Sequence, residues 1–360
     1  MRTGLLVYGS LDTVSGGYLY DRKLVDHLKR QGQPVEVFSL PWRNYTRHLG
    51  DNLSSSLCRQ LRTANLDVLL QDELNHPSLF WLNRRLRVDY PIVSIVHHLR
   101  SSEQRPAWQN RLYRLIERSY LHSVDGFVFN SHTTRQVVAQ TGVDLKKTPW
   151  IVAHPAGDHF AAQVDEAVIL QRAMQPGPLR LLFLGNVIPR KGLHTVLQAM
   201  QQLPSATCTL QVVGSLQVDR AYIDRLYHII AAAGLQGRVQ FLGSIKTQAL
   251  AQRLLESQVL VVPSSYEGFG IGYLEGMSFG LPAIATTAGA AGEIITHGSD
   301  GFLLPPNDPQ SLADCLAGLA AERPRLGEMG AAARQRFLAH PTWEQTAERI
   351  FQFLRGVANP

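Results

Sequence analysis

Strand-length apolar runs alternate with helical stretches along the chain, and this alternation limits the fold more than any other feature. Six such runs lie in the first half, at 5–8, 35–39, 67–70, 92–96, 126–129 and 151–153. Six more lie in the second half, at 179–184, 209–213, 239–242, 259–262, 283–285 and 302–304. Strands that alternate with helices at this spacing form parallel sheets through right-handed crossovers. The pattern predicts an α/β protein with two doubly wound parallel sheets.

The length of the chain agrees with two domains. A chain of 360 residues is expected to form about two, and 45% hydrophobic residues can fill two cores. Charged residues make up 18%, which excludes a disordered chain. The run Gln175-Pro176-Gly177-Pro178 is rich in turn residues just before a strand, so we expect the linker between the domains there.

The cysteines and the amino-terminal sequence indicate in which cellular compartment the protein is expected. Cys58, Cys208 and Cys315 are far apart and lack the C-x-x-C spacing of a zinc site or the pattern of a disulfide framework. The chain starts with a strand pattern instead of a signal peptide, and no apolar run approaches the roughly 20 residues of a spanning helix. We expect a reducing, cytoplasmic location.

The excess of positive charge is confined to the first half of the chain. Residues 1–160 hold 20 Lys and Arg against 14 Asp and Glu, whereas residues 161–360 hold 15 of each. One dense basic stretch, at 105–118, falls on a predicted helix that also carries the apolar residues Trp108, Leu112, Leu115 and Ile116. Such a helix either rests on an anionic membrane surface or is an ordinary amphipathic helix with a solvated face. Nucleic-acid binding is not expected, because the basic residues form no known module and are not interleaved with stacking aromatics.

Two glutamates bracket the most informative run. Glu267 and Glu275 follow a buried strand pattern, with Gly268, Gly270 and Gly272 between them. Glycines let the backbone approach a ligand closely, and amides at the start of the following helix can meet a diphosphate. Carboxylates accept hydrogen bonds from the hydroxyls of a hexose and a ribose. The run predicts a sugar-nucleotide site at the carboxyl end of a strand.

Two cations and a glycine pair mark further strand ends. Arg190 and Lys191 lie between a strand and the amino terminus of a helix, where the helix dipole disfavours cations. A bound anion such as a diphosphate would compensate for this placement. The alternative to such an anion site is a pair of solvated cations. Gly16 and Gly17 follow the first strand, and they either face a phosphate or sugar or form a tight turn. They lack the spacing of the G-x-G-x-x-G dinucleotide fingerprint.

Polar residues also follow two strands of the first half. His97 and His98 come directly after the strand at 92–96, so at least one of them is expected to point beyond the carboxyl end of the sheet. A lone histidine in such a place is often structural. Ser131 follows the next strand, where it either lines the acceptor side or caps a helix.

The run from Glu267 to Glu275 resembles the E-x7-E signature of the retaining glycosyltransferases of family 4. The segment at 183–192 and the Gly16-Gly17 pair resemble that family's diphosphate-binding segment and its amino-terminal glycine loop. The resemblance covers most of the chain and implies the GT-B fold, with two Rossmann-like domains facing across a cleft. The implied parts are an acceptor-binding domain at 1–160, a nucleotide-sugar domain at 161–340, and a last helix at 341–360 that packs back on the first domain.

The resemblance also implies roles for single residues. Glu267 would hold the hydroxyls of the donor hexose, Glu275 those of the ribose, and His97 the hexose from the opposite domain. Arg190 and Lys191 would neutralise the leaving diphosphate and complete, with Glu267 and His97, the catalytic set. The other donor-binding residues would be Gly16, Gly17, Gly185, Phe241, Gly268, Phe269, Gly270 and Ile271. Ser131 and His98 would lie on the acceptor side.

The activity implied by the resemblance is retaining transfer of a hexose from a UDP- or GDP-sugar to a hydroxyl of a glycan, lipid-linked or small-molecule acceptor. The donor is a co-substrate, and we expect no resident cofactor. The departing phosphate would take the acceptor's proton. No D-x-D run stands where a metal-bridged diphosphate needs it, so we expect no metal. A peripheral contact of the basic first half with the inner face of the membrane is one of the two alternatives for its charge, the other being a solvated face.

Other functions remain open from the sequence. A sugar-nucleotide epimerase or hydrolase of the same fold would turn over the donor without an acceptor. A catalytically silent nucleotide-sugar-binding scaffold is disfavoured, because the glutamates and cations of the signature are all present. A nicotinamide dehydrogenase needs the dinucleotide fingerprint, which the first glycine loop lacks. The run His154-Pro155-Ala156-Gly157-Asp158 departs from the family's usual P-N-G-[VI]-D, which affects a turn between domains and not the catalytic set.

Overall fold

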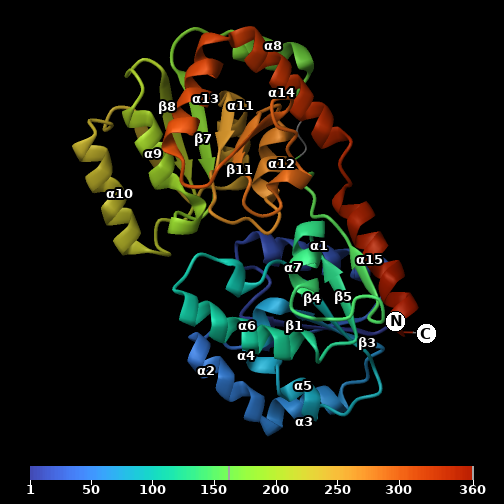
Figure 1. Cartoon of the computed structure of the whole chain (residues 1–360). Coiled ribbons are helices and arrows are strands. Elements are labelled where there is room, and N and C mark those ends of the chain that lie inside the picture. The colour runs from blue at the N-terminus through green and yellow to red at the C-terminus, as the bar shows by residue number, and fades with distance from the viewer. Residues whose placement is uncertain (161–162, 359–360) are drawn as a thin grey trace. The chain divides into compact units, whose positions relative to one another are not determined.

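The computed structural model describes residues 1–160 and 163–358 and contains two parallel six-stranded sheets, as predicted (Figure 1). The chain forms two compact units. The first comprises Met1–Pro155 and the chain from Pro341 onward, and the second comprises Ala156–His340. The chain thus leaves the first unit after Pro155, against an expected boundary at 160.

The linker expected at Gln175 to Pro178 is wrong. This run lies inside the second unit, between helix α8 (Glu166–Ala173) and strand β7 (Leu179–Leu184). Proline and glycine end a helix and start a strand in the same way within a unit as between units, so turn residues alone do not locate a domain boundary.

The twelve strands agree with the predicted runs to within two residues. In the first unit they are β1 Thr3–Tyr8, β2 Val35–Leu40, β3 Val68–Asp72, β4 Ile92–Val96, β5 Gly126–Phe129 and β6 Trp150–Val152. In the second they are β7, β8 Cys208–Val213, β9 Val239–Gly243, β10 Val259–Val261, β11 Ala283–Thr286 and β12 Gly301–Leu304.

Helices follow most strands. Those of the first unit are α1 Gly16–Arg30, α2 Tyr45–Leu49, α3 Ser55–Thr63, α4 His76–Leu79, α5 Leu82–Arg85, α6 Ala107–Leu121, α7 His132–Ala139 and α15 Trp343–Ala358. Those of the second are α8, α9 Leu193–Gln201, α10 Arg220–Ala232, α11 Thr247–Glu256, α12 Ile271–Met277, α13 Pro309–Ala321 and α14 Arg323–Leu338. Among the described residues, no helix has the length and apolar character needed to cross a bilayer.

The order of the strands determines where a ligand can bind in each unit. The strands of the first sheet have the order β2-β1-β3-β4-β5-β6, and the direction in which successive strands are added reverses between β1 and β3. The second runs β12-β11-β10-β7-β8-β9 and reverses between β7 and β10. At such a reversal the connections leave toward opposite faces of the sheet, which opens a crevice beyond the carboxyl ends of the two central strands.

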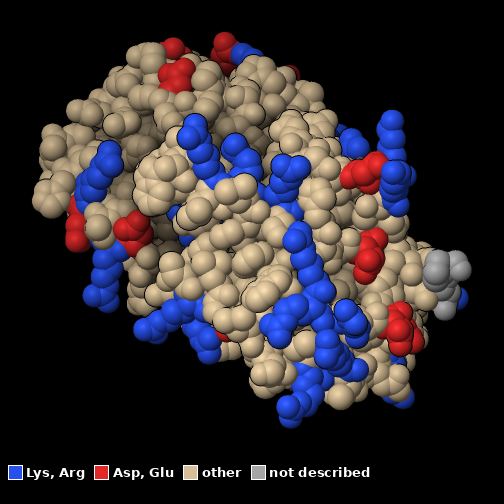
Figure 2. Space-filling model, turned by 60° about the horizontal axis from the view of Figure 1, so that its bottom comes forward, with Lys and Arg blue, Asp and Glu red and all other residues tan. Residues whose placement is uncertain are grey.

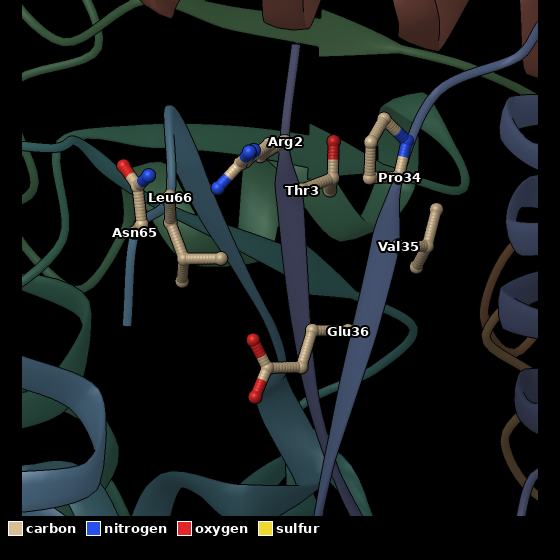
Figure 3. Close-up of a pocket in the computed structure, with 7 residues that line it drawn as sticks. All are labelled: Arg2, Thr3, Pro34, Val35, Glu36, Asn65 and Leu66. Atoms are coloured by element: carbon tan, nitrogen blue, oxygen red, sulfur yellow. The ribbon is translucent and has the colours of Figure 1, made fainter. Parts of the chain in front are cut away.

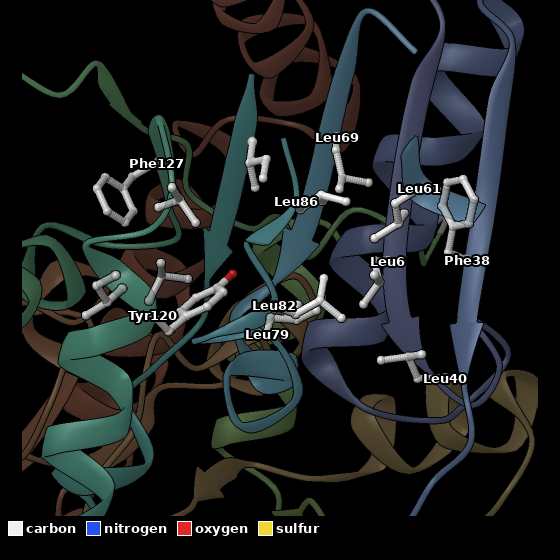
Figure 4. Close-up of a cluster of buried hydrophobic side chains, with 14 of the residues drawn as sticks. Leu6, Phe38, Leu40, Leu61, Leu69, Leu79, Leu82, Leu86, Tyr120 and Phe127 are labelled. Carbon is white, nitrogen blue, oxygen red and sulfur yellow. The ribbon is translucent and has the colours of Figure 1, made fainter. Parts of the chain in front are cut away.

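The core of the first unit lies between its sheet and the covering helices. Leu6, Leu69 and Phe127 point from the strands into this cluster and are fully buried (Figure 4). Helix α6 contributes Tyr120, which is also fully buried and donates a hydrogen bond to Ser94 Oγ at 3.0 Å. Parallel strands buried on both faces read as continuous apolar runs, which is why the sequence showed them clearly.

Helix α15 belongs to the first unit, where it packs against α1 (Figure 1). The two ring nitrogens of His27 on α1 lie 3.0 Å from carboxylate oxygens of Glu344 and Glu348 on α15. Trp343, at the start of α15, is buried with its ring 5.9 Å from that of Tyr20. The end of the chain therefore covers one side of the first unit.

A pocket of about 280 Å³ opens at the amino ends of β1 and β2 (Figure 3). Its lining residues are Arg2, Thr3, Pro34, Val35, Glu36, Asn65 and Leu66. The pocket lies at the edge of the sheet opposite to the carboxyl ends, where ligands bind in open parallel sheets. The functional site is therefore expected at the opposite edge of the sheet.

Candidate active site

Three charged residues of the second unit meet where its strand order reverses. Lys191 follows β7 and Glu267 follows the neighbouring strand β10. Lys191 Nζ donates to Glu267 Oε2 at 2.6 Å, and Ser264 Oγ donates to the same oxygen at 3.0 Å. Nη1 of Arg190 lies 3.8 Å from this oxygen and donates to the carbonyl of Tyr266 at 2.7 Å. One carboxylate thus holds two cations at the reversal point.

This cluster combines two positive charges with one negative charge. Burial by itself would raise the pKa of Glu267, but Lys191 and Arg190 outweigh that effect and lower the pKa to about 2. The carboxylate is therefore ionised at any physiological pH. The side chains of Glu267, Lys191 and Arg190 are 12, 17 and 23% exposed, so solvent and ligands still reach them.

The loop between the two signature glutamates has a conformation that requires glycine. Gly270 has a φ of +107°, and a Cβ at this position would lie 2.3 Å from the Tyr273 ring. Tyr273 is held in place because its hydroxyl donates to the carbonyl of Val262 at 2.9 Å. Gly270 is the residue before α12, so the loop passes directly into that helix.

Glu275 on α12 is paired with a residue that the sequence did not single out. Its Oε1 lies 3.1 Å from Nε2 of His159. The backbone before His159 runs close to α12, since a Cβ on Gly157 would lie 2.7 Å from Cβ of Leu274. This close approach brings His159 next to the second signature glutamate.

Four of the other donor-side residues lie in three different places. Gly185 lies beside the side chain of Lys191: a Cβ added to Gly185 would be 3.4 Å from Lys191 Cε. The side chains of Phe269 and Ile271 are buried, so any contact that they make with a ligand comes from the backbone. Phe241 lies on the edge strand β9, two strands from β7, with its ring 5.1 Å from that of Tyr227.

In the first unit, His97 lies against the glycine loop. Gly16 and Gly17 are the first residues of α1, which Ser15 caps by accepting from the amide of Tyr18 at 3.3 Å. A Cβ on Gly17 would lie 3.1 Å from Cδ2 of His97, so glycine is needed for this close approach. The carbonyl of His97 accepts from Nδ2 of Asn130 at 2.7 Å, which ties the ends of β4 and β5 together.

Two buried carboxyl groups face His97. Asp21 on α1 and Asp72 at the end of β3 are both buried, and their oxygens lie within 4.8 Å of each other and of a His97 ring nitrogen. Burial would lower the pKa of His97, but Asp21 and Asp72 raise it to about 9. Burial, followed by the charge of Asp21, raises the pKa of Asp72 to about 7. The first unit therefore holds an imidazolium beside two buried carboxyl groups, of which Asp72 titrates near neutral pH.

The two acceptor-side residues are placed differently from His97. Nε2 of His98 lies 3.0 Å from Oε1 of Glu103, away from the glycine loop that His97 contacts. Ser131 is fully buried and caps α7, accepting from the amide of Thr134 at 3.0 Å. Of the two roles expected for Ser131, the helix cap and the acceptor side, the helix cap accounts for its position.

Asp21, Asp72 and His159 are the residues near these sites that sequence reasoning missed. Asp72 carried a usable signal, because it ends a strand next to the one that precedes His97. Asp21 carried none, since a carboxylate on an amphipathic helix normally faces solvent. His159 carried no local signal, because it lies just beyond the run 154–158.

Two family models match this chain. The model of the glycosyl transferases group 1 matches residues 166–336, within the second unit. The model of the glycosyl transferase 4-like domain matches residues 14–151, within the first. The chain belongs to the family 4 glycosyltransferases. Each unit of this glycosyltransferase thus corresponds to one of the two domains of the family.

Curated relatives match this glycosyltransferase over part of their length. A GDP-mannose-dependent alpha-(1-6)-phosphatidylinositol monomannoside mannosyltransferase of Mycobacterium tuberculosis is 29% identical over 182 residues, 48% of this chain and 46% of the relative. The D-rhamnosyltransferase WbpZ of Pseudomonas aeruginosa is 31% identical over 233 residues, 63% of this chain and 58% of the relative. The chain spans about half the length of the curated relatives it matches.

Solved structures share the fold over nearly the whole chain. A sucrose-phosphate synthase (tll1590) from Thermosynechococcus elongatus has a TM-score of 0.84 at 20% identity, with 99% of this chain and 98% of the other covered. Anabaena Alr3699/HepE in complex with UDP and glucose has a TM-score of 0.77 at 21% identity, with 99% of both chains covered. The fold of this glycosyltransferase is GT-B.

Proposed function

We propose that this chain transfers a hexose from a UDP- or GDP-sugar to a hydroxyl of a glycan, lipid-linked or small-molecule acceptor, with retention at the anomeric carbon and without a metal ion. The observation that carries the proposal is the cluster at the strand reversal of the second unit. There Nζ of Lys191 and Nη1 of Arg190 lie 2.6 and 3.8 Å from Oε2 of Glu267. The two cations follow β7, Glu267 follows β10, and all three side chains are partly exposed.

The cluster suits a diphosphate leaving group. A diphosphate brings at least two negative charges, so it competes well with the single carboxylate of Glu267 for Lys191 and Arg190. Released from these cations, Glu267 can accept hydrogen bonds from the hydroxyls of the sugar. Both cations then stabilise the negative charge that develops on the diphosphate as the glycosidic bond breaks.

The reaction proposed is a substitution at the anomeric carbon. The bond from this carbon to the β-phosphate oxygen breaks, and the oxygen of the acceptor hydroxyl forms its bond on the same face. The acceptor's proton passes to the departing phosphate. The products are a glycoside and a nucleoside diphosphate, so atoms and charge balance. For His97 we propose a contact with the donor hexose, on the strength of the family resemblance.

The names of relatives and fold neighbours support the class of donor. One curated relative is described as GDP-mannose-dependent, and Alr3699/HepE has been solved with UDP-glucose. We propose a donor of the same chemical class. For Glu275, whose Oε1 lies 3.1 Å from Nε2 of His159, we propose that it holds the ribose hydroxyls.

Metal independence rests on the charge of the site. Lys191 and Arg190 provide two positive charges where a bridging cation would otherwise neutralise the diphosphate. The reaction should therefore proceed in the presence of a chelator.

For the acceptor we propose a lipid-linked or polysaccharide intermediate, reached through a peripheral contact of the first unit with the cytoplasmic face of a membrane. The charge of that unit supports this, because residues 1–160 carry the whole excess of positive charge. The curated mannosyltransferase named above is described as acting on a phosphatidylinositol monomannoside, which is a membrane lipid.

The test measures binding and turnover on the full chain. Thermal shifts with UDP, GDP, ADP and their sugar conjugates, with and without a chelator, should show a base-selective rise in melting temperature that the chelator leaves intact. Glu275→Ala should reduce the shift, and Glu328→Ala, which removes an exposed carboxylate on α14, should leave it unchanged. Absence of any shift at millimolar nucleotide would overturn the proposal. Donor turnover that is the same with and without acceptors would identify an epimerase or hydrolase instead.

A further inference from the structure

Helix α6 presents an apolar stripe to solvent. Trp108, Leu112 and Leu115 are 66, 53 and 65% exposed. Their spacing of four and three residues places them on one face of the helix. Large apolar side chains gathered on an exposed face usually mark an interaction site.

The orientation of this face is fixed by the packing of the opposite side. Glu117, Tyr120 and Leu121 are buried, and Ser101 donates its backbone amide to Oε1 of Glu117 at 3.1 Å. The ring of Tyr113 lies 4.7 Å from that of Tyr45. The stripe therefore cannot turn inward without unpacking the helix.

Arginines line the stripe and no exposed carboxylate balances them on the helix. Arg111, Arg114 and Arg118 are exposed along one flank, and none of them makes an ion pair with another described residue. The only acidic residue of α6 is Glu117, which is buried. Arg84 of α5 reaches the carbonyl of Ser119 at 3.4 Å and adds a further exposed cation. Lys and Arg side chains also crowd the lower half of the face seen in Figure 2, with few Asp and Glu among them.

We infer that the exposed face of α6 is a membrane-docking surface that lies in the interface of an anionic lipid bilayer. The inference deepens the proposed peripheral contact and rests on it for the partner, but it does not depend on the donor chemistry. Trp108, Leu112 and Leu115 would enter the headgroup and upper acyl region, and the arginines would pair with lipid phosphates.

The chemistry of the face favours a bilayer over the other occupants. A helix that carries Trp and Leu on one face with arginines beside them has the composition of interfacial helices. The positive charge complements anionic headgroups, whereas a second copy of the same face would bring like charges together. Nucleic acid would use the arginines but leave the leucines in water.

The test is flotation of the full-length protein with phosphatidylcholine vesicles, with and without phosphatidylglycerol. We expect binding to the anionic vesicles, at least tenfold weaker binding to pure phosphatidylcholine, and weakening by salt. Leu112→Ser with Leu115→Ser should lower binding about tenfold, and Arg111→Gln with Arg114→Gln should lower it and flatten its dependence on salt. The matched control, Leu338→Ser with Arg225→Gln, changes an exposed leucine and an exposed arginine of the second unit and should bind as the wild type does.

Two outcomes would overturn the inference: a wild type that stays unbound with anionic vesicles at low salt, or α6 variants that float like the control. A dimer that the leucine substitutions dissociate, or nucleic-acid binding that the arginine substitutions remove, without vesicle binding in either case, would also overturn it. UDP and GDP affinity is measured on the same proteins. Vesicle binding without nucleotide binding would count against the proposed transferase activity and would still support the membrane-docking surface.

Discussion

Oδ1 of Asp21 lies 3.5 Å from Nε2 of His97, in a site where the Asp21 carboxylate is fully buried. Among the described residues neither carboxylate oxygen of Asp21 has a hydrogen-bond partner within the usual limits, so His97 is the group that compensates its charge. The ring edge with Cδ2 and Nε2 faces α1. Asp21 therefore both orients the imidazole and favours its protonated form.

Replacement of this carboxylate should change the titration of His97. In Asp21→Asn the pKa of His97, raised to about 9 in the wild type, should fall toward its ordinary value because the direct contact with the Asp21 carboxylate is lost. Side-chain NMR of the imidazole would measure the shift, and transfer should slow by about tenfold with a changed pH profile. The control Asp26→Asn alters an exposed carboxylate of the same helix and should leave the titration unchanged.

The same site predicts how stability depends on pH. Because the folded state raises the pKa of His97 from 6.5 to about 9, its contribution is complete below pH 6.5 and disappears as the pH rises through 9. The loss amounts to at most about 3 kcal/mol. Asp72 and Glu73, with pKa values raised to about 7, change the free energy of unfolding in the same direction at lower pH. Urea unfolding at pH 6.5 and 9 should show a smaller difference for His97→Gln than for the wild type; equal differences would contradict the prediction.

Loss of the lysine at the strand reversal should weaken nucleotide binding. Lys191→Met removes a charged donor from the proposed diphosphate site, and such a bond contributes about 1.5–3 kcal/mol. The dissociation constant of UDP or GDP should therefore rise about 10- to 100-fold, as measured by titration calorimetry. The melting temperature should also fall, because Glu267 keeps its buried charge with one partner fewer. Lys246→Met, at an exposed position, serves as the control, and unchanged affinity in Lys191→Met would refute the diphosphate assignment.

The assignment of Glu275 to the ribose predicts a specific loss of discrimination. The wild type should bind a ribonucleoside diphosphate more tightly than its 2′-deoxy analogue, because the carboxylate accepts hydrogen bonds from the ribose hydroxyls. In Glu275→Ala the ribonucleotide should bind about tenfold more weakly and the two analogues should become equivalent. Discrimination that survives in the variant would place the ribose elsewhere.

The glycine before α12 should be sensitive to the smallest substitution. In Gly270→Ala the new Cβ meets the Tyr273 ring at 2.3 Å on a backbone with a φ of +107°. A strained φ of this kind costs about 1–3 kcal/mol, so the melting temperature should fall by several degrees. Gly237→Ala is the matched control, because a Cβ there has no heavy atom within 4 Å and the φ is not positive. Equal melting temperatures for the two variants would exclude the strain.

The strands and the charged pair of the second unit were predictable for different reasons. Buried parallel strands are continuous apolar runs between turn residues, so each of the twelve was visible in the sequence. Lys191 and Glu267 each follow a strand, and the carboxyl ends of parallel strands meet at one edge of the sheet. The sequence did not reveal that these two strands are neighbours at a reversal, because strand order depends on long-range pairing.

The features that were missed depend on the direction of single side chains. Asp21 lies on a helix whose pattern does not distinguish a buried carboxylate from a solvated one. His159 meets Glu275 across more than a hundred residues of sequence, which no local pattern records. The linker was misplaced because proline and glycine mark any abrupt change of structure, and at Pro176 that change lies within one unit.

The return of α15 to the first unit has a consequence for the order in which the protein is built. The chain leaves this unit after Pro155 and rejoins it at Pro341, so the second unit is inserted into the first. On the ribosome, residues 156–340 are made before α15 exists, and they can fold as a unit while the surface of α1 around His27 and Tyr20 is still uncovered. The first unit, although begun first, is therefore completed last.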